Sequence, residues 1–263
     1  MLISDSTRRA YECDLNKFAR WYEETTGSPP DWDSVGPLDI AEFKRYLLTR
    51  GQKPSTINRA LHALSHYFEQ RDMPNPCREI KKVEGEPLPP RWLDRTEKQK
   101  FVRAVREYGS NRDYAMVVLM LHCGLRVSEV CSRKVGYVDR DFLKIQGKGE
   151  KYREVPLNST ARSALIPLLK GRSSEDWLFP SKRGGPMTPR NLQKLFARYS
   201  RLAGIEVTPH DLRHSFCKSL IDAGHGLSLV GDYAGHSSLE TTRRYTAPSR
   251  EELKEAAEDI AWN

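Results

Sequence analysis

The stretch TPHDLRHSF, residues 208–216, combines a helix start with a dense group of polar side chains. Thr208 followed by Pro209 pairs an N-cap residue with proline at the first helical position. His210 and Arg213 then fall in the first turns, where unpaired backbone N–H groups and the helix dipole favour an anion. The stretch therefore predicts a helix whose beginning can bind a phosphate or another anion.

Metal and nucleotide chemistry are alternative interpretations of such side chains. His210 and His214 have the four-residue spacing of a helical zinc pair. Arg213 shares their face, however, where its charge repels a divalent cation, and no obvious third ligand follows. The turn GKG at 147–149 lacks the Ser/Thr and the preceding glycine of a Walker loop, and acidic pairs typical of a two-metal nuclease are not evident. We therefore expect neither a metal nor a cofactor.

Positive charge is concentrated in the second part of the chain. The 263 residues hold 43 Lys and Arg against 35 Asp and Glu, a net charge of 43 − 35 = +8. Residues 1–86 contribute 13 − 14 = −1, and residues 87–263 contribute 30 − 21 = +9. A basic body of this size favours a polyanionic partner, nucleic acid first. Composition alone leaves open a charge that serves only solubility.

Membrane and disulfide-stabilised classes do not fit the sequence. The longest wholly apolar run, residues 115–121, is far shorter than the roughly 20 residues that span a bilayer. The N-terminus turns polar too early for a signal peptide. The five cysteines are odd in number and lack CxxC spacing. We expect no membrane partner, no disulfide scaffold and a cytoplasmic location.

Two domains are predicted, joined by a proline-rich linker at 83–95. Residues 1–82 carry three apolar stripes at helical spacing, which predicts a small all-α domain. In the second part, short strands at 142–146 and 152–155 flank the GKG turn as a hairpin. Further helices are predicted at 96–108, 112–123, 159–170 and 189–203. The expected fold class is mainly α with a small antiparallel β-hairpin.

Single polar residues stand at element boundaries outside the opening stretch. Arg126 follows Gly-Leu at a junction between two predicted helices, and Lys148 sits at the tip of the hairpin. His236 follows a glycine at the start of a helix, which Tyr245 closes nine residues later. Taken singly, each is better explained as a solvated charge or an ordinary polar neighbour.

Together these segments resemble the ordered signature of the tyrosine recombinases, the phage-integrase and XerC/XerD-like family. The matching blocks are GLRVSE (124–129), GKGEKYREVPL (147–157), HDLRHSF (210–216) and GHSSLETTRRY (235–245). The resemblance covers residues 95–250, and residues 1–82 are similar to the family's helical core-binding domain, without a sharp motif. It implies the two-domain architecture of the family: a SAM-like core-binding domain at 1–82 and a mixed α+β catalytic domain at 96–263, which ends in an exchange helix at about 249–261.

The resemblance also implies roles for individual residues. The positions that match the family's catalytic set are Arg126, Glu129, Lys148, His210, Arg213, His236 and Tyr245. The two arginines would grip the scissile phosphate, with Glu129 as a supporting acid and His236 bonded to a phosphate oxygen. Tyr245 would attack as a phenolate, and because its reference pKa is near 10 it requires a base, for which His210 is the candidate. Lys148 would protonate the departing 5′ oxygen.

The implied function is a site-specific DNA recombinase that works through a 3′-phosphotyrosyl intermediate and a Holliday junction. It would be of the Xer type or a transposon- or plasmid-borne resolvase, nucleoid-associated and independent of metal and ATP. Its partners would be double-stranded DNA with an inverted-repeat core site and copies of itself, as a dimer on one site and a tetramer in the synapse. Two alternatives stay open: a type IB topoisomerase-like nicking-closing enzyme, and a regulator that binds DNA without cutting it.

Overall fold

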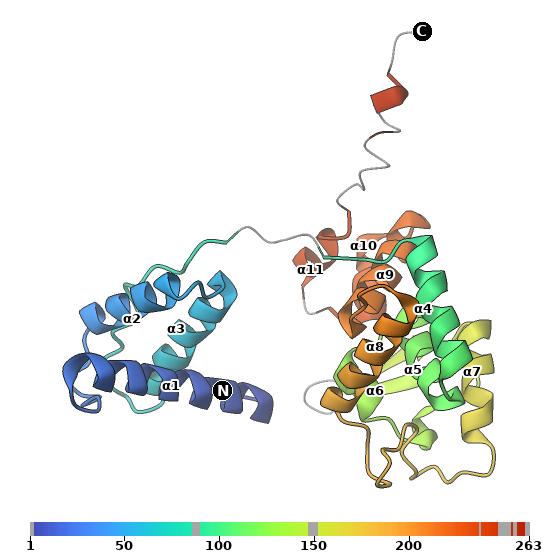
Figure 1. The fold of residues 1–263 in the computed structure, drawn as a ribbon, viewed down its shortest axis with the longest axis horizontal. Helices are drawn as coiled ribbons and strands as arrows, with labels where there is room; N and C mark the ends of the chain where they lie inside the picture. Colours follow the sequence, from blue (N-terminus) through green and yellow to red (C-terminus); the bar gives the residue numbers. More distant parts are fainter. Residues whose placement is uncertain are drawn as a thin grey trace. The chain divides into compact units, whose positions relative to one another are not determined.

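The structure is a computed structural model, and it describes residues 3–85, 90–146, 152–236, 238–246, 254 and 257–260. The chain divides into two compact units, residues 1–87 and 88–263, each with its own hydrophobic core. The described part is mainly helical with one two-stranded antiparallel sheet (Figure 1), as the predicted fold class requires. None of its helices combines the length and the apolar character needed to cross a membrane.

The first unit is built on aromatic side chains. Its described helices are α1 (Asp5–Thr26), α2 (Pro37–Thr49) and α3 (Pro54–Glu69). Proline occupies the first position of α2 and α3, where its missing N–H is not needed. Phe18 of α1 meets Phe43 of α2 edge to face, with 5.1 Å between ring centroids. The buried Asp14 carboxylate accepts both a 2.7 Å and a 3.0 Å bond from Arg59, which ties α1 to α3.

The second unit is organised around one buried helix. Its described elements are α4 (Arg95–Tyr108), α5 (Asn111–His122), α6 (Val127–Cys131), η1 (Val135–Tyr137), β1 (Phe142–Gln146), β2 (Tyr152–Pro156), α7 (Ser159–Leu169), α8 (Pro189–Ala203), α9 (Pro209–Asp222), α10 (Leu227–Ala234) and α11 (Leu239–Arg243). Residues 115–120 of α5 are buried on every side, as a helix that is apolar all round must be. It packs against α4, α7 and α9.

The hairpin follows α6 and η1 in the sequence and carries one side chain into the candidate site. β1 pairs antiparallel with β2, and Ile145 stands opposite Arg153. Leu143 and Ile145 on β1 and Val155 on β2 are buried in the core of the second unit, which fixes the register. Residues 147–151, which join the strands and include Lys148, lie outside the described residues.

Candidate active site

The first part of the candidate site forms where α6 begins. Gly124 has a left-handed conformation (φ 62°), and a Cβ atom there would collide with the ring of Phe216. Arg126 then caps α6: its backbone N–H donates to Oε2 of Glu129 (2.7 Å), and its Nη1 donates to Oε1 (3.0 Å). Because Glu129 is buried while the Arg126 side chain is 38% exposed, the carboxylate orients a cation that solvent can still reach.

The second arginine lies on α9. Thr208 caps this helix, accepting a hydrogen bond from the backbone of Asp211, so the helix begins where the sequence predicted. Arg213 is buried, and its guanidinium donates to the carbonyls of Gly124 and Ala234, the latter at 2.8 Å from Nη2. Burial, and then the charge of the other site arginine, lowers the pKa of Arg213 to about 10. The guanidinium therefore stays charged at neutral pH.

The C-terminus of α10 gathers these arginines. The carbonyl of Ala234 accepts from Arg213 and also from Nη2 of Arg153 (3.4 Å), and the carbonyl of Gly235 accepts from Arg126. The last carbonyls of a helix lack partners within the helix and carry partial negative charge, so they suit cations. Gly235 ends α10 in a left-handed conformation (φ 67°). The carbonyl oxygens at the helix end thus accept the hydrogen bonds of the arginines in place of further acidic side chains.

Arg153 was not among the residues predicted from the sequence. From β2 it donates to both oxygens of Glu129, at 2.7 Å from Nη1 and 3.2 Å from Nη2. Burial alone would raise the pKa of Glu129, but the hydrogen bonds from Arg153 and from the backbone of Arg126 outweigh it and lower that pKa. The only signal in the sequence was the place of Arg153 in the block GKGEKYREVPL.

Tyr245 follows α11 and packs into a small core with residues of α9 and α10. It is 2% exposed, and its Oη lies 2.6 Å from Nδ1 of His214. His210, the base expected from the sequence, is exposed and one turn away, with 6.3 Å between the two imidazole centroids. The structure thus brings His214 to the hydroxyl in this conformation. The signal was present in the four-residue spacing of the two histidines, which had suggested only a zinc pair.

His236 flanks the same tyrosine ring. The two rings are nearly parallel, with 9° between their planes and 6.1 Å between their centroids. Nδ1 of His236 lies 2.9 Å from Oγ1 of Thr242, a fully buried residue of α11. Tyr245 is therefore bordered by one imidazole at its hydroxyl and by another along its ring.

Burial sets the protonation of these groups. It lowers the pKa of His214 to about 4, with His210 as the next cause, and that of His236 to about 4, with Arg213 as the next cause. It also raises the pKa of Tyr245 above the ordinary value. At neutral pH the site holds neutral imidazoles beside a protonated phenol, which becomes a strong nucleophile only when a base takes its proton.

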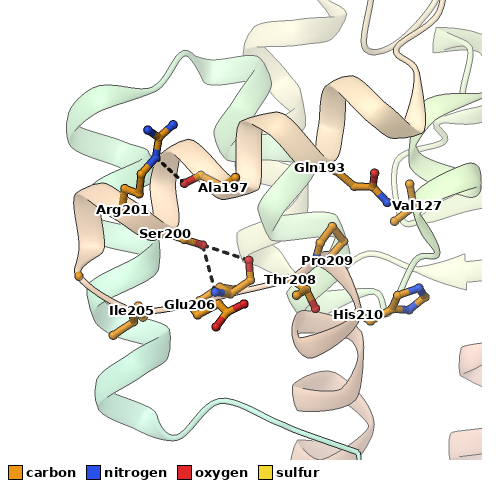
Figure 2. A pocket seen from close by; sticks show the side chains of 12 residues that line it. Val127, Gln193, Ala197, Ser200, Arg201, Ile205, Glu206, Thr208, Pro209 and His210 are labelled. Carbon is orange, nitrogen blue, oxygen red and sulfur yellow. Dashed lines mark hydrogen bonds between the residues drawn. The ribbon is translucent and has the colours of Figure 1, made fainter. Parts of the chain in front are cut away.

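A cavity of about 850 Å³ borders the site (Figure 2). Gln193 and Arg201 line it from α8, and Val127 and His210 line it from the side of the candidate site. Ser200 closes part of the wall, because its hydroxyl both donates to and accepts from the backbone of the loop after α8 at 3.0 Å. His210 is exposed and lies at the edge of this cavity, next to His214.

The predicted site residues are only partly brought together. Those that converge on the α10 terminus and the Tyr245 core are Arg126, Glu129, Arg213, His236 and Tyr245. His210 stands at the edge of this group, next to His214. Lys148 lies outside the described residues. The arrangement offers two oriented guanidiniums, neutral imidazoles and one buried phenol, which together suit the transfer of a phosphoryl group to the phenol.

Comparisons with known proteins identify the family to which the chain belongs. The model of the phage integrase family matches residues 91–252, and that of the phage integrase N-terminal SAM-like domain matches residues 2–70. Tyrosine recombinase XerD of Pseudomonas putida is 33% identical over 273 residues, which cover 96% of this chain and 90% of that protein. Tyrosine recombinase XerA of Pyrococcus furiosus is 30% identical over 262 residues, covering 97% and 88%.

Solved structures with the same architecture include recombinases bound to DNA. XerH site-specific recombinase bound to a palindromic difH substrate, a post-cleavage complex, has a TM-score of 0.74 at 25% identity and covers 95% of this chain and 78% of that one. The Tn1549 transposon integrase in complex with transposon right end DNA has a TM-score of 0.73 at 21% identity, covering 99% and 95%. The latter likeness concerns the fold alone.

Proposed function

The chain belongs to the phage integrase family of tyrosine recombinases and is a site-specific recombinase, and we propose that it cleaves DNA through a 3′-phosphotyrosyl intermediate and exchanges strands through a Holliday junction. The observation that carries the proposal is the setting of Tyr245. Its hydroxyl lies 2.6 Å from a neutral imidazole, in a unit where two arginines are already oriented on one helix end. A nucleophile, a proton acceptor and charge neutralisation are thereby available together.

Arg126 and Arg213 are the proposed phosphate-binding pair. A guanidinium has five N–H donors, more than the two side-chain hydrogen bonds described above for each residue, so donors remain for the non-bridging oxygens. A fork of donors matches a phosphate bidentately, and Arg213 stays charged at neutral pH. Such groups stabilise the charge of the pentavalent transition state, and loss of one costs about 3 kcal/mol in the barrier.

In the proposed cleavage step, Oη of Tyr245 forms a bond to phosphorus while the bond from phosphorus to the 5′ oxygen breaks. The phenolic proton passes to an imidazole: His214 is in hydrogen-bond distance in this conformation, and His210 is the base that the family resemblance suggests. Lys148, also proposed from that resemblance, gives the departing oxygen its proton, so a 5′ hydroxyl leaves. The ester retains the bond energy, and attack by another 5′ hydroxyl reverses the step and rejoins DNA.

The proposed organisation follows the family. Residues 1–82 act as the core-binding domain, 83–95 as the linker, and 96–263 as the catalytic domain with an exchange helix at about 249–261. The match of residues 2–70 to the SAM-like domain and the net charge of +9 on residues 87–263 support this division.

We propose that the partner is double-stranded DNA with an inverted-repeat core site, bound by a dimer and synapsed by a tetramer in the cytoplasm, at the nucleoid. One structural relative is a lambda integrase dimer bound to a COC′ core site, which supports only the proposed dimer on one site. The enzyme is of the Xer type or a transposon- or plasmid-borne resolvase.

The test is cleavage of a nicked suicide DNA whose cut strand cannot religate. A covalent protein–DNA adduct on a denaturing gel is the expected result. DNA binding without any adduct would instead indicate a regulator that binds DNA without cutting it. Exchange of strands between two duplexes then separates a recombinase from a type IB topoisomerase-like enzyme, which only nicks and closes one strand.

A further inference from the structure

The buried carboxylate of Glu129 is shared by two cations, of which only one belongs to the proposed phosphate-binding pair. Arg126 meets one oxygen through Nη1 and the other through its backbone N–H. Arg153 meets both oxygens with its own two Nη atoms. The orientation of Arg126 therefore depends on where Arg153 holds the carboxylate.

Arg153 is itself closely confined. Its side chain is 22% exposed, and Nη2 also reaches the carbonyl of Ala234, the acceptor of Arg213. A Cβ atom on Gly235 would lie 2.7 Å from the guanidinium carbon, so only glycine permits this approach. The Nε atom of Arg153 is buried without a hydrogen-bond partner in the described part of the chain. A buried donor without a partner destabilises the folded state, so the stability of the fold does not explain why Arg153 is held here.

A structural link between α6 and the hairpin already exists at Arg133. Its Nε donates to the backbone carbonyl of Glu129 (2.8 Å), and its Nη1 donates to the carbonyl of Lys144 on β1 (3.0 Å). Arg133 is buried, and its Nη2 donates to the hydroxyl of Ser132 (3.0 Å), so none of these three bonds reaches the carboxylate of Glu129. Arg153 differs because its bonds go to the carboxylate that orients Arg126. Substituting each of the two residues therefore separates an effect on the stability of the fold from an effect on the orientation of Arg126.

We propose that Arg153 is a positioning residue for DNA cleavage: through Glu129 it holds the guanidinium of Arg126 in the geometry that receives the scissile phosphate. This inference rests on the proposed function. Through the shared carbonyl of Ala234, Arg153 also restrains the acceptor of Arg213. It acts on the phosphate through these neighbours and not by direct contact.

The first test compares Arg153→Ala, Arg153→Lys and Arg133→Ala in single-turnover cleavage of suicide DNA, with DNA affinity and thermal unfolding measured on the same samples. Arg153→Ala should slow cleavage by about 10- to 100-fold, the effect of a small misplacement of a binding group, with DNA affinity nearly unchanged. Arg153→Lys should recover part of the rate, because it keeps the charge but not the fork. Arg133→Ala should lower the melting temperature while retaining more of the rate. Equal slowing by Arg153→Ala and Arg133→Ala would overturn the proposal.

The second test asks whether Arg153 works through Glu129. In a double-mutant cycle, Arg153→Ala should slow the Glu129→Gln variant by less than about 3-fold, because the carboxylate through which it acts has already lost its charge. If the two effects multiply, Arg153 acts independently of Glu129 and the proposal is wrong.

The third test does not require activity. In side-chain ¹⁵N–¹H spectra, the Nε–H signal of Arg126, assigned with Arg126→Lys, should shift or broaden in Arg153→Ala and stay in place in Arg133→Ala. A wild-type chain that forms no adduct would refute the proposed function. The spectra alone would then decide whether Arg153 positions Arg126. An Arg126 signal that is unchanged in Arg153→Ala would refute the positioning role.

Discussion

Replacing Tyr245 by Phe removes one oxygen atom and keeps the ring. The ring can retain its parallel contact with His236 and its place in the core with Cys217. The hydrogen bond between Oη and Nδ1 of His214, at 2.6 Å, is lost. The substitution therefore separates the chemistry of the hydroxyl from the packing of the side chain.

The expected stability loss is small and the expected loss of chemistry is complete. His214 is partly buried and loses its partner, which costs about 1 kcal/mol. For a unit of the size of residues 88–263, that corresponds to a fall of about 2–4 °C in Tm. Adduct formation should disappear because no other atom can take the place of Oη. DNA affinity should be nearly unchanged, since a buried hydroxyl contributes no charge.

The matched control is Tyr233→Phe. The hydroxyl of Tyr233 donates to the carbonyl of Pro156 at 2.8 Å, and its ring packs on Phe216, so the same atom and a similar bond are removed. Its Tm should fall by a similar amount while adduct on suicide DNA forms as in the wild type. Residual adduct in Tyr245→Phe, or its loss in Tyr233→Phe, would show that the wrong hydroxyl was assigned.

Four further outcomes are expected. Lys148→Ala should slow cleavage of normal DNA, and a substrate with a 5′ bridging sulfur should restore the rate, because a thiolate departs without a proton. If the sulfur substrate instead rescues Lys151→Ala, then Lys151 is the residue that protonates the leaving oxygen. The pKa values of His214 and His236 are about 4 in the folded chain and about 6.5 in the unfolded chain. As pH falls, the unfolded chain therefore takes up protons before the folded chain does. The free energy of unfolding should thus fall as pH drops from 6.5 towards 4, and a denaturant midpoint that is flat across this window contradicts it. DNA affinity should weaken steeply as salt rises, and an affinity indifferent to salt would be evidence against phosphate contacts. Deleting residues 250–263, which hold most of the proposed exchange helix, should leave single-site binding intact and weaken dimer assembly on the full site. Unchanged cooperativity of binding would refute a contact between this segment and a neighbouring protomer.

Much of the second unit could be predicted because its signals are local. The helices expected at 96–108 and 189–203 begin within one residue of α4 and α8, since caps, prolines and apolar periodicity act over a few residues. The same holds for the start of α9 at Thr208. Arg126 and Arg213 could be singled out because each lies in a short motif of fixed order.

The tertiary structure alone decided which groups meet. His210 and His214 are one turn apart on one helix, so their spacing could not say which imidazole lies against Tyr245; the packing of the chain after α11 onto α9 selects His214. Arg153 is one cation among many in the sequence, and its role depends on a strand being brought to α6 and to the end of α10. Carbonyl acceptors at that helix end belong to the backbone, which every residue shares. Their use as ligands for arginine therefore arises only from the fold.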